Sequence, residues 1–181
     1  SLVRMIVNII EPTHGTVLDP ACGSGGMFVS SADFIEQYGA NANTAMTFFG
    51  QEKVDYNAKL CIMNMAVHGL NAKIVSGDEA NSFYHDAHNL EGSCDYVMAN
   101  PPFNLSDWGA DRLQDDVRWQ YGLPPAGNAN YAWIQHMIYH LAPNGKIGLV
   151  LANGALSTQT GGEGEIRRKI IEADLIEGII A

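Results

Sequence analysis

The sequence contains Thr16-Val17-Leu18-Asp19-Pro20-Ala21-Cys22-Gly23-Ser24-Gly25-Gly26, a short apolar run that passes directly into a glycine-rich turn. The next residues, from about Met27 to Tyr38, have the apolar spacing of a helix, and Gly39 marks its end. Glycines in such a turn let backbone amides approach a ligand closely, and the amino-terminus of the helix adds the positive end of its dipole. The segment therefore predicts a strand, a ligand-binding turn and a helix in succession.

The spacing of these glycines narrows the choice of ligand. A dinucleotide fingerprint, G-x-G-x-x-G, would need glycine at position 28, where this chain has Phe28. The lysine of a phosphate-binding P-loop is also missing from the turn. The turn therefore argues against nicotinamide cofactors and ATP.

Outside this segment, short apolar runs alternate with helical patterns. Besides the first strand and helix, we expect strands at Met46–Glu52, Ala72–Ser76, around Tyr96–Met98, at Lys146–Leu151 and at Leu175–Ile180, and helices at Leu2–Ile10, Asp55–Val67, Asn130–Leu141 and Glu165–Ala173. Strands that alternate with helices predict an α/β fold of the Rossmann-like type, a doubly wound and mostly parallel sheet with helices on both faces.

Polar residues follow several of these strands at their carboxyl ends. Glu52 ends the second strand, where an acidic side chain can bind ribose hydroxyls. Asp78 follows the third strand, where its carboxylate can accept a hydrogen bond from an adenine amino group. A helix N-cap is an equally good explanation of Asp78. Because the ends of parallel strands share one edge of a sheet, one cleft would contain these residues.

The fourth strand ends in Asn100-Pro101-Pro102-Phe103. Prolines cannot donate hydrogen bonds to a sheet, so they force the strand to stop and present Asn100 and Phe103 at its end. A polar amide beside a stacking ring suggests chemistry on something flat and nitrogenous. An ordinary turn remains the alternative, since Asn-Pro dipeptides commonly start turns.

Two long connections carry no clear periodicity. Residues 104–127 contain Trp108, Trp119 and Tyr121, and we expect a mobile loop over the substrate site. Residues 154–164 form a second glycine-rich loop, and Pro143-Asn144-Gly145 is expected to turn into the fifth strand.

Composition limits the class of protein. The 181 residues are 46% hydrophobic and fit one domain over residues 1–181. No apolar run reaches the roughly 20 residues of a membrane-spanning helix, and residues 1–11 lack the features of a signal peptide, so a cytoplasmic protein is expected. The three cysteines, Cys22, Cys61 and Cys94, are far apart and are expected to be reduced thiols. Both ends fall inside apolar patterns, which suggests a core cut from a longer chain.

The charge is unfavourable for a protein that binds nucleic acid alone. Twenty acidic residues against ten basic residues give a formal net charge of −10. Free-standing nucleic-acid binders are usually basic, because they must neutralise phosphates. If DNA is the substrate, another protein must help to hold it.

The histidines do not form a recognisable metal site. His136 and His140 have helical spacing, but no glutamate stands between them as in an H-E-x-x-H zinc site, so ordinary histidines on a helix face are expected. The segment His85-Asp86-Ala87-His88 contains metal-ligand types, and a solvated loop explains it as well. We therefore predict no metal.

The glycine turn and Asn100-Pro101-Pro102-Phe103 together resemble the amino-methylating DNA methyltransferases that use S-adenosylmethionine. Three further segments resemble the modification subunit of type I restriction-modification systems: Gly127-Asn128-Ala129-Asn130-Tyr131-Ala132-Trp133, Asn153-Gly154-Ala155-Leu156 and Glu165-Ile166-Arg167. The resemblance covers nearly the whole chain.

This resemblance implies an S-adenosylmethionine-dependent adenine-N6 methyltransferase. Residues 19–26 would hold the methionine end of the cofactor, Glu52 its ribose and Asp78 its adenine. The target base, flipped from the duplex, would bind at Asn100, Pro101, Pro102 and Phe103. The implied partners are DNA, a specificity subunit that reads its sequence and a second modification subunit, with a restriction subunit as a further candidate.

Two other readings stay open at this stage. An aromatic residue after Asn-Pro-Pro also suits methylation of a protein glutamine or an RNA base. Alternatively, the chain is a non-catalytic scaffold of the same fold, which would account for its acidity.

Overall fold

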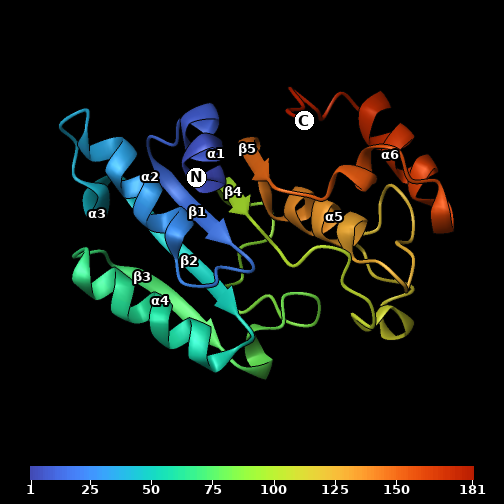
Figure 1. Ribbon diagram of the computed structural model, residues 1–181, viewed down its shortest axis with the longest axis horizontal. Helices are drawn as coiled ribbons and strands as arrows, with labels where there is room; N and C mark the ends of the chain where they lie inside the picture. The colour runs from blue at the N-terminus through green and yellow to red at the C-terminus, as the bar shows by residue number, and fades with distance from the viewer. The chain divides into compact units, whose positions relative to one another are not determined.

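The computed structural model describes residues 1–181, which divide into two compact units (Figure 1). The first, here called the sheet unit, comprises Ser1–Pro101 and Met137–Val150. The second, the loop unit, comprises Pro102–His136 and Leu151–Ala181.

A parallel five-stranded sheet forms the centre of the sheet unit, in the order β3-β2-β1-β4-β5 (Figure 1). The strands are β1 (Gly15–Asp19), β2 (Met46–Glu52), β3 (Ala72–Ser76), β4 (Cys94–Ala99) and β5 (Leu141–Leu149). Chain order reverses between β1 and β4, which is the topological switch point where sheets of this kind bind ligands. The predicted Rossmann-like α/β fold is confirmed.

Six α-helices accompany the strands, and four of them lie on connections between strands, as is usual for parallel pairing. They are α1 (Leu2–Ile10), α2 (Gly26–Glu36), α3 (Ala42–Ala45), α4 (Asp55–Val67), α5 (Asn130–His140) and α6 (Glu163–Glu172), with short 3-10 helices η1 (Asp78–Ala80), η2 (Ala110–Arg112), η3 (Asn153–Leu156) and η4 (Thr160–Gly162). Helix α5 passes from the loop unit into the sheet unit at Met137. A membrane-spanning segment is not found among these helices, since none is both long and apolar enough.

Both faces of the sheet are buried, because apolar side chains along each central strand point alternately to one face and the other. On one face Val17, Phe48 and Met98 form a cluster with side chains of α1, α2 and α4. On the other face Leu18 and Val97 form a second cluster with Met137 of α5 and others. Since successive side chains of a strand point to opposite faces, this pattern explains why the central strands are apolar throughout.

Two expectations about the strands need correction. Residues 175–180 form no strand, and Leu175, Ile176, Ile179 and Ile180 are 39 to 64% exposed. Apolar content alone does not make a strand, because a strand also needs a neighbour with which to pair its backbone. The fifth strand begins at Leu141 rather than at Lys146. Its register with β4 shifts between the pairs Cys94–Leu141 and Tyr96–Lys146. The turn expected at Pro143 is therefore an irregularity within β5.

Close packing at Gly50 of β2 gives a test of this core. A Cβ atom there would lie 2.8 Å from Cys22 Sγ and 2.8 Å from Ile74 Cδ1. We expect Gly50→Ala to lower the free energy of unfolding by about 1–3 kcal/mol, as overpacking usually does. Urea unfolding followed by circular dichroism measures this, with Gly178→Ala as control because a Cβ there meets nothing within 4 Å. Equal midpoints for the two variants would show that this packing is not tight.

Candidate active site

The candidate residues of the sheet unit follow four adjacent strands at one edge of the sheet. The order across the edge is Asp78 after β3, Glu52 at the end of β2, the segment 19–26 after β1, and Asn100 after β4. The strands are parallel and in register, with Asp19 opposite Gly50 and Glu52 opposite Ser76. With about 4.8 Å between neighbouring strands, the four ends span roughly 14 Å. The expected grouping at one edge is confirmed for these residues.

Residues 19–26, here called the glycine turn, have two different sides. Gly23 and Gly25 adopt φ angles of 54° and 81°, in the left-handed region that favours glycine. A Cβ on Gly25 would lie 2.8 Å from Cys61 Sγ, whereas a Cβ on Gly23 or Gly26 would meet nothing within 4 Å. Gly25 therefore packs against the core, while Gly23 and Gly26 leave open space where a ligand can approach the backbone.

Residues far away in the sequence hold the glycine turn in place. Ser82 Oγ donates to the Pro20 carbonyl at 2.6 Å, and Asn64 Nδ2 donates to the Ser24 carbonyl at 2.9 Å. The Cys22 N–H donates to the Gln51 carbonyl at 3.0 Å. No local pattern marks Ser82 or Asn64, because each acts only through a contact formed on folding. The turn is thus fixed before any ligand binds.

Glu52 connects the glycine turn to helix α4. Its Oε2 accepts the Gly23 N–H at 2.9 Å, and its Oε1 accepts the Val54 N–H at 2.8 Å. A carboxylate offers about four lone-pair positions, so two remain for hydroxyl donors of a ligand. Glu52 therefore has a supporting role in the turn that the sequence did not indicate.

Asp19 is a buried acid at the start of the glycine turn. Its Oδ1 accepts the Ala21 N–H at 3.0 Å, and the side chain is 3% exposed. Burial raises the pKa of Asp19 to about 7, the Ala21 hydrogen bond opposes this shift, and repulsion by Glu52 adds to it. A carboxyl group that titrates near neutral pH will ionise more readily when a cation binds beside it.

Asp78 lies exposed at the sheet edge as the first residue of η1. The N-cap of η1 is Gly77, at φ 74°, so the alternative in which Asp78 is a helix N-cap is wrong. Its carboxylate is therefore not committed to capping that helix.

Asn100 is exposed directly after β4, whose end is fixed by the Val150 N–H donating to the Ala99 carbonyl at 3.1 Å. Pro101 is buried in the sheet unit. Pro102 and Phe103 belong to the loop unit, and Phe103 is 46% exposed. An exposed aromatic ring suits the stacking of a planar ligand.

The histidines take structural positions. His136 and His140 lie on α5, and both are buried. His136 Nδ1 lies 2.9 Å from Arg118, which pairs with Asp116 at 2.7 Å. His88 Nε2 lies 2.9 Å from the Gly50 carbonyl. No group of three or more metal-ligand side chains is present, and all three cysteines are free and buried.

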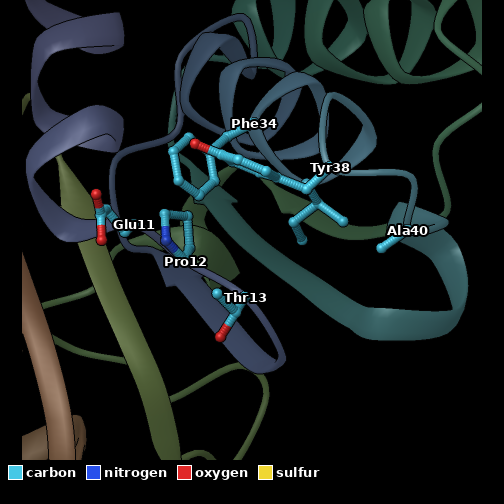
Figure 2. Close-up of a pocket in the computed structure, with 7 residues that line it drawn as sticks. Glu11, Pro12, Thr13, Phe34, Tyr38 and Ala40 are labelled. Carbon is cyan, nitrogen blue, oxygen red and sulfur yellow. The ribbon is translucent and has the colours of Figure 1, made fainter.

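A cavity of about 320 Å³ lies at the opposite edge of the sheet, before β1 begins (Figure 2). Pro12 and Thr13 line it from one side, and Phe34 of α2 and Tyr38, just after α2, line it from the other. It contains none of the candidate residues. The cavity is therefore separate from the candidate active site.

The whole chain, residues 1–181, matches the protein family described as N-6 DNA Methylase. It is 50% identical over 181 residues to the type I restriction enzyme HindI methylase subunit of Haemophilus influenzae, covering 100% of this chain and 40% of that protein. It is 46% identical over 187 residues to the MjaIX methylase subunit of Methanocaldococcus jannaschii, covering 100% of this chain and 32% of that protein. Both relatives are thus much longer than the chain.

Among solved structures, a type I restriction-modification methyltransferase subunit from Streptococcus thermophilus superposes with a TM-score of 0.80 at 27% identity. The match covers 94% of this chain and 37% of that one. The fold of the chain is therefore that of a subunit of this kind.

The raised pKa of Asp19 predicts how stability depends on pH. The folded chain retains the proton up to about pH 7, whereas an ordinary Asp releases it near 3.8. The contribution of the neutral carboxyl group to the free energy of unfolding is therefore fully present below pH 4. It is lost as pH rises through 7, by up to about 1.4 kcal/mol per pH unit. Asp19→Asn keeps the acceptor for Ala21 but cannot titrate, so wild type should lose stability relative to this variant between pH 4 and 7.

Urea unfolding at several pH values measures the difference. Asp33→Asn, which removes an exposed carboxylate of α2, should follow the wild-type curve. Parallel curves for wild type and Asp19→Asn would contradict the raised pKa.

Proposed function

Since the chain belongs to the N-6 DNA Methylase family, we propose that residues 1–181 are the catalytic core of a type I modification subunit. The reaction is methyl transfer from S-adenosylmethionine to the N6 amino group of a DNA adenine. The observation that carries the proposal is the order of Asp78, Glu52, the glycine turn and Asn100 across four neighbouring strand ends.

The order of these residues matches the order of the parts of the cofactor. The glycine turn would hold the methionine end, Glu52 the ribose hydroxyls and Asp78 the adenine amino group. Open space at Gly23 and Gly26 supports this fit, as do the lone pairs that remain on Glu52. When bound, the cofactor supplies an electrophilic methyl group on a sulfonium. Asp19, buried beside the methionine end, would ionise in response to that positive charge.

The target base would bind beside β4, the strand next to β1. The lone pair of an adenine amino group is delocalised into the ring, so this nitrogen is a poor nucleophile. The Asn100 side-chain oxygen and the Pro101 carbonyl would accept hydrogen bonds from its two N–H groups and favour a more tetrahedral nitrogen. Phe103 would stack on the base and partly offset the roughly few kcal/mol that flipping it from the duplex costs.

The net charge of −10 supports a dependence on partners. An acidic surface repels DNA phosphates, so other subunits must supply positive charge. The curated relatives named above are methylase subunits of type I restriction enzymes. We therefore include a specificity subunit, a second modification subunit and a restriction subunit among the proposed partners, in the cytoplasm where the DNA is.

Substitution of Asn100 tests the catalytic role. In the full-length subunit with its specificity partner, Asn100→Ala should lower methyl transfer to DNA by about 100-fold or more, because one acceptor for the amino group is lost. Binding of S-adenosylmethionine, measured by calorimetry, should not change. Asn71→Ala, an exposed asparagine at the amino end of β3, is the control. Full activity of Asn100→Ala would remove Asn100 from the mechanism.

Glu52→Gln tests the cofactor site. The amide group has only one oxygen, so it cannot accept both the Gly23 and the Val54 N–H groups. We expect affinity for S-adenosylmethionine to fall by about 10-fold or more, the usual order for losing a charge-assisted hydrogen bond. Glu79→Gln, at an exposed position of η1, should bind normally in the same titration. Unchanged binding by Glu52→Gln would place the ribose elsewhere.

A further inference from the structure

Three asparagines link the residue after Phe103 to the start of helix α5. The Asn104 N–H donates to Asn130 Oδ1 at 3.0 Å, and Asn130 Nδ2 donates back to Asn104 Oδ1 at 3.0 Å. Asn128 Nδ2 donates to the same Asn104 Oδ1 at 3.1 Å. We call these three residues the asparagine clamp. All of them lie in the loop unit.

Two further hydrogen bonds make the clamp continuous with α5. Asn128 Oδ1 accepts the Asn130 N–H at 2.8 Å, and the Ala129 N–H donates to the Leu105 carbonyl at 2.9 Å. Asn130 is 2% exposed, so water does not compete for its amide group. The residues after Phe103 are therefore held against a helix end by mutually oriented amides, of which that of Asn130 is buried.

The conformation of Asn104 shows why the turn depends on this clamp. Its φ angle is 52°, in the left-handed region that asparagine tolerates better than most residues. Pro101 and Pro102 have no N–H and cannot secure the turn by donating hydrogen bonds. The first backbone donor beyond Phe103 is Asn104, and the clamp holds it.

We propose that the asparagine clamp positions the ring of Phe103 for stacking on the target base, with Asn130 as the principal positioning residue. The inference rests on the proposed function of Phe103. The clamp touches no reacting atom. It sets the direction in which the chain leaves Phe103, and so the plane of the ring.

The same substitution, Asn to Asp, at two positions distinguishes the loss of a clamp hydrogen bond from the effect of an added negative charge. The side chain of Asn104 takes part in the clamp only through its oxygen. Asn104→Asp therefore keeps both hydrogen bonds that this oxygen accepts. Asn130 uses its side-chain N–H as a donor, so Asn130→Asp replaces that donor with an oxygen facing the oxygen of Asn104. Each variant adds one negative charge, and the side chains lie within hydrogen-bond distance of each other.

The experiment uses the full-length subunit with its specificity partner and two DNA sites. The unmodified site serves to measure kcat, and the same site with 2-aminopurine in place of the target adenine, which cannot be methylated, serves to measure fluorescence. At saturating DNA, Asn130→Asp should lower kcat by about 10-fold to 100-fold and change the 2-aminopurine fluorescence of the complex, with S-adenosylmethionine binding retained. Asn104→Asp should keep kcat within about 3-fold of wild type. Asn43→Ala, which removes an asparagine bridging two loops at the amino ends of the strands, is the unaffected control.

Equal losses in the two aspartate variants, or no loss in Asn130→Asp, would overturn the clamp while leaving the proposed function intact. If Asn130→Asp does not fold, Asn104→Gly decides, because glycine adopts the same φ angle without the side-chain acceptor. It should show the same loss of kcat, and normal activity would overturn the clamp. A wild-type complex that transfers no methyl group to any DNA would overturn the proposed function, and the role of the clamp with it.

Discussion

Parallel pairing of β1 with both β2 and β4 is the constraint on which the rest of the molecule depends. Val17 is opposite Phe48 on one side and Tyr96 on the other, so the three strands share one register. Because the strands are parallel, all their carboxyl ends meet at one edge, and every connection must cross a face of the sheet. Strand pairing alone thus brings the glycine turn, Glu52, Asp78 and Asn100 to neighbouring strand ends.

The two proposed sites are organised by different kinds of interaction. At the glycine turn a carboxylate, Glu52, fixes backbone amides, and a second carboxyl group, Asp19, is buried beside it. Beyond Phe103 the supports are neutral amide groups of Asn104 and Asn130. Charge is useful where a cationic cofactor binds. Near a polyanion, hydrogen bonds between neutral groups are less sensitive to salt than ion pairs are.

The periodicity of apolar residues predicted most helices and strands. It predicted none of the hydrogen bonds that hold the glycine turn and the chain after Phe103. Helix α4 and strands β2 and β3 have the predicted bounds, because turn residues delimit each pattern. The prediction of a strand at residues 175–180 was wrong, since apolar composition does not reveal whether a neighbouring strand is available for pairing. The contacts of Ser82 with Pro20 and of Asn130 with Asn104 could not be found in advance, because a polar residue carries no local signal of the distant group it meets.

If an acidic chain binds DNA, as proposed, only a few of its groups can contribute favourable interactions with the substrate. With a net charge of −10, long-range attraction is absent, so binding must depend on stacking, on hydrogen bonds and on other subunits. Stacking is effective only if the ring is held in one orientation before the base arrives, since ordering it during binding costs entropy. The ring of Phe103 is 46% exposed, and the next residue, Asn104, is hydrogen-bonded to the buried Asn130, as the proposed positioning requires. In the proposed function, the hydrogen bonds that hold the chain after Phe103 thus contribute where electrostatic attraction cannot.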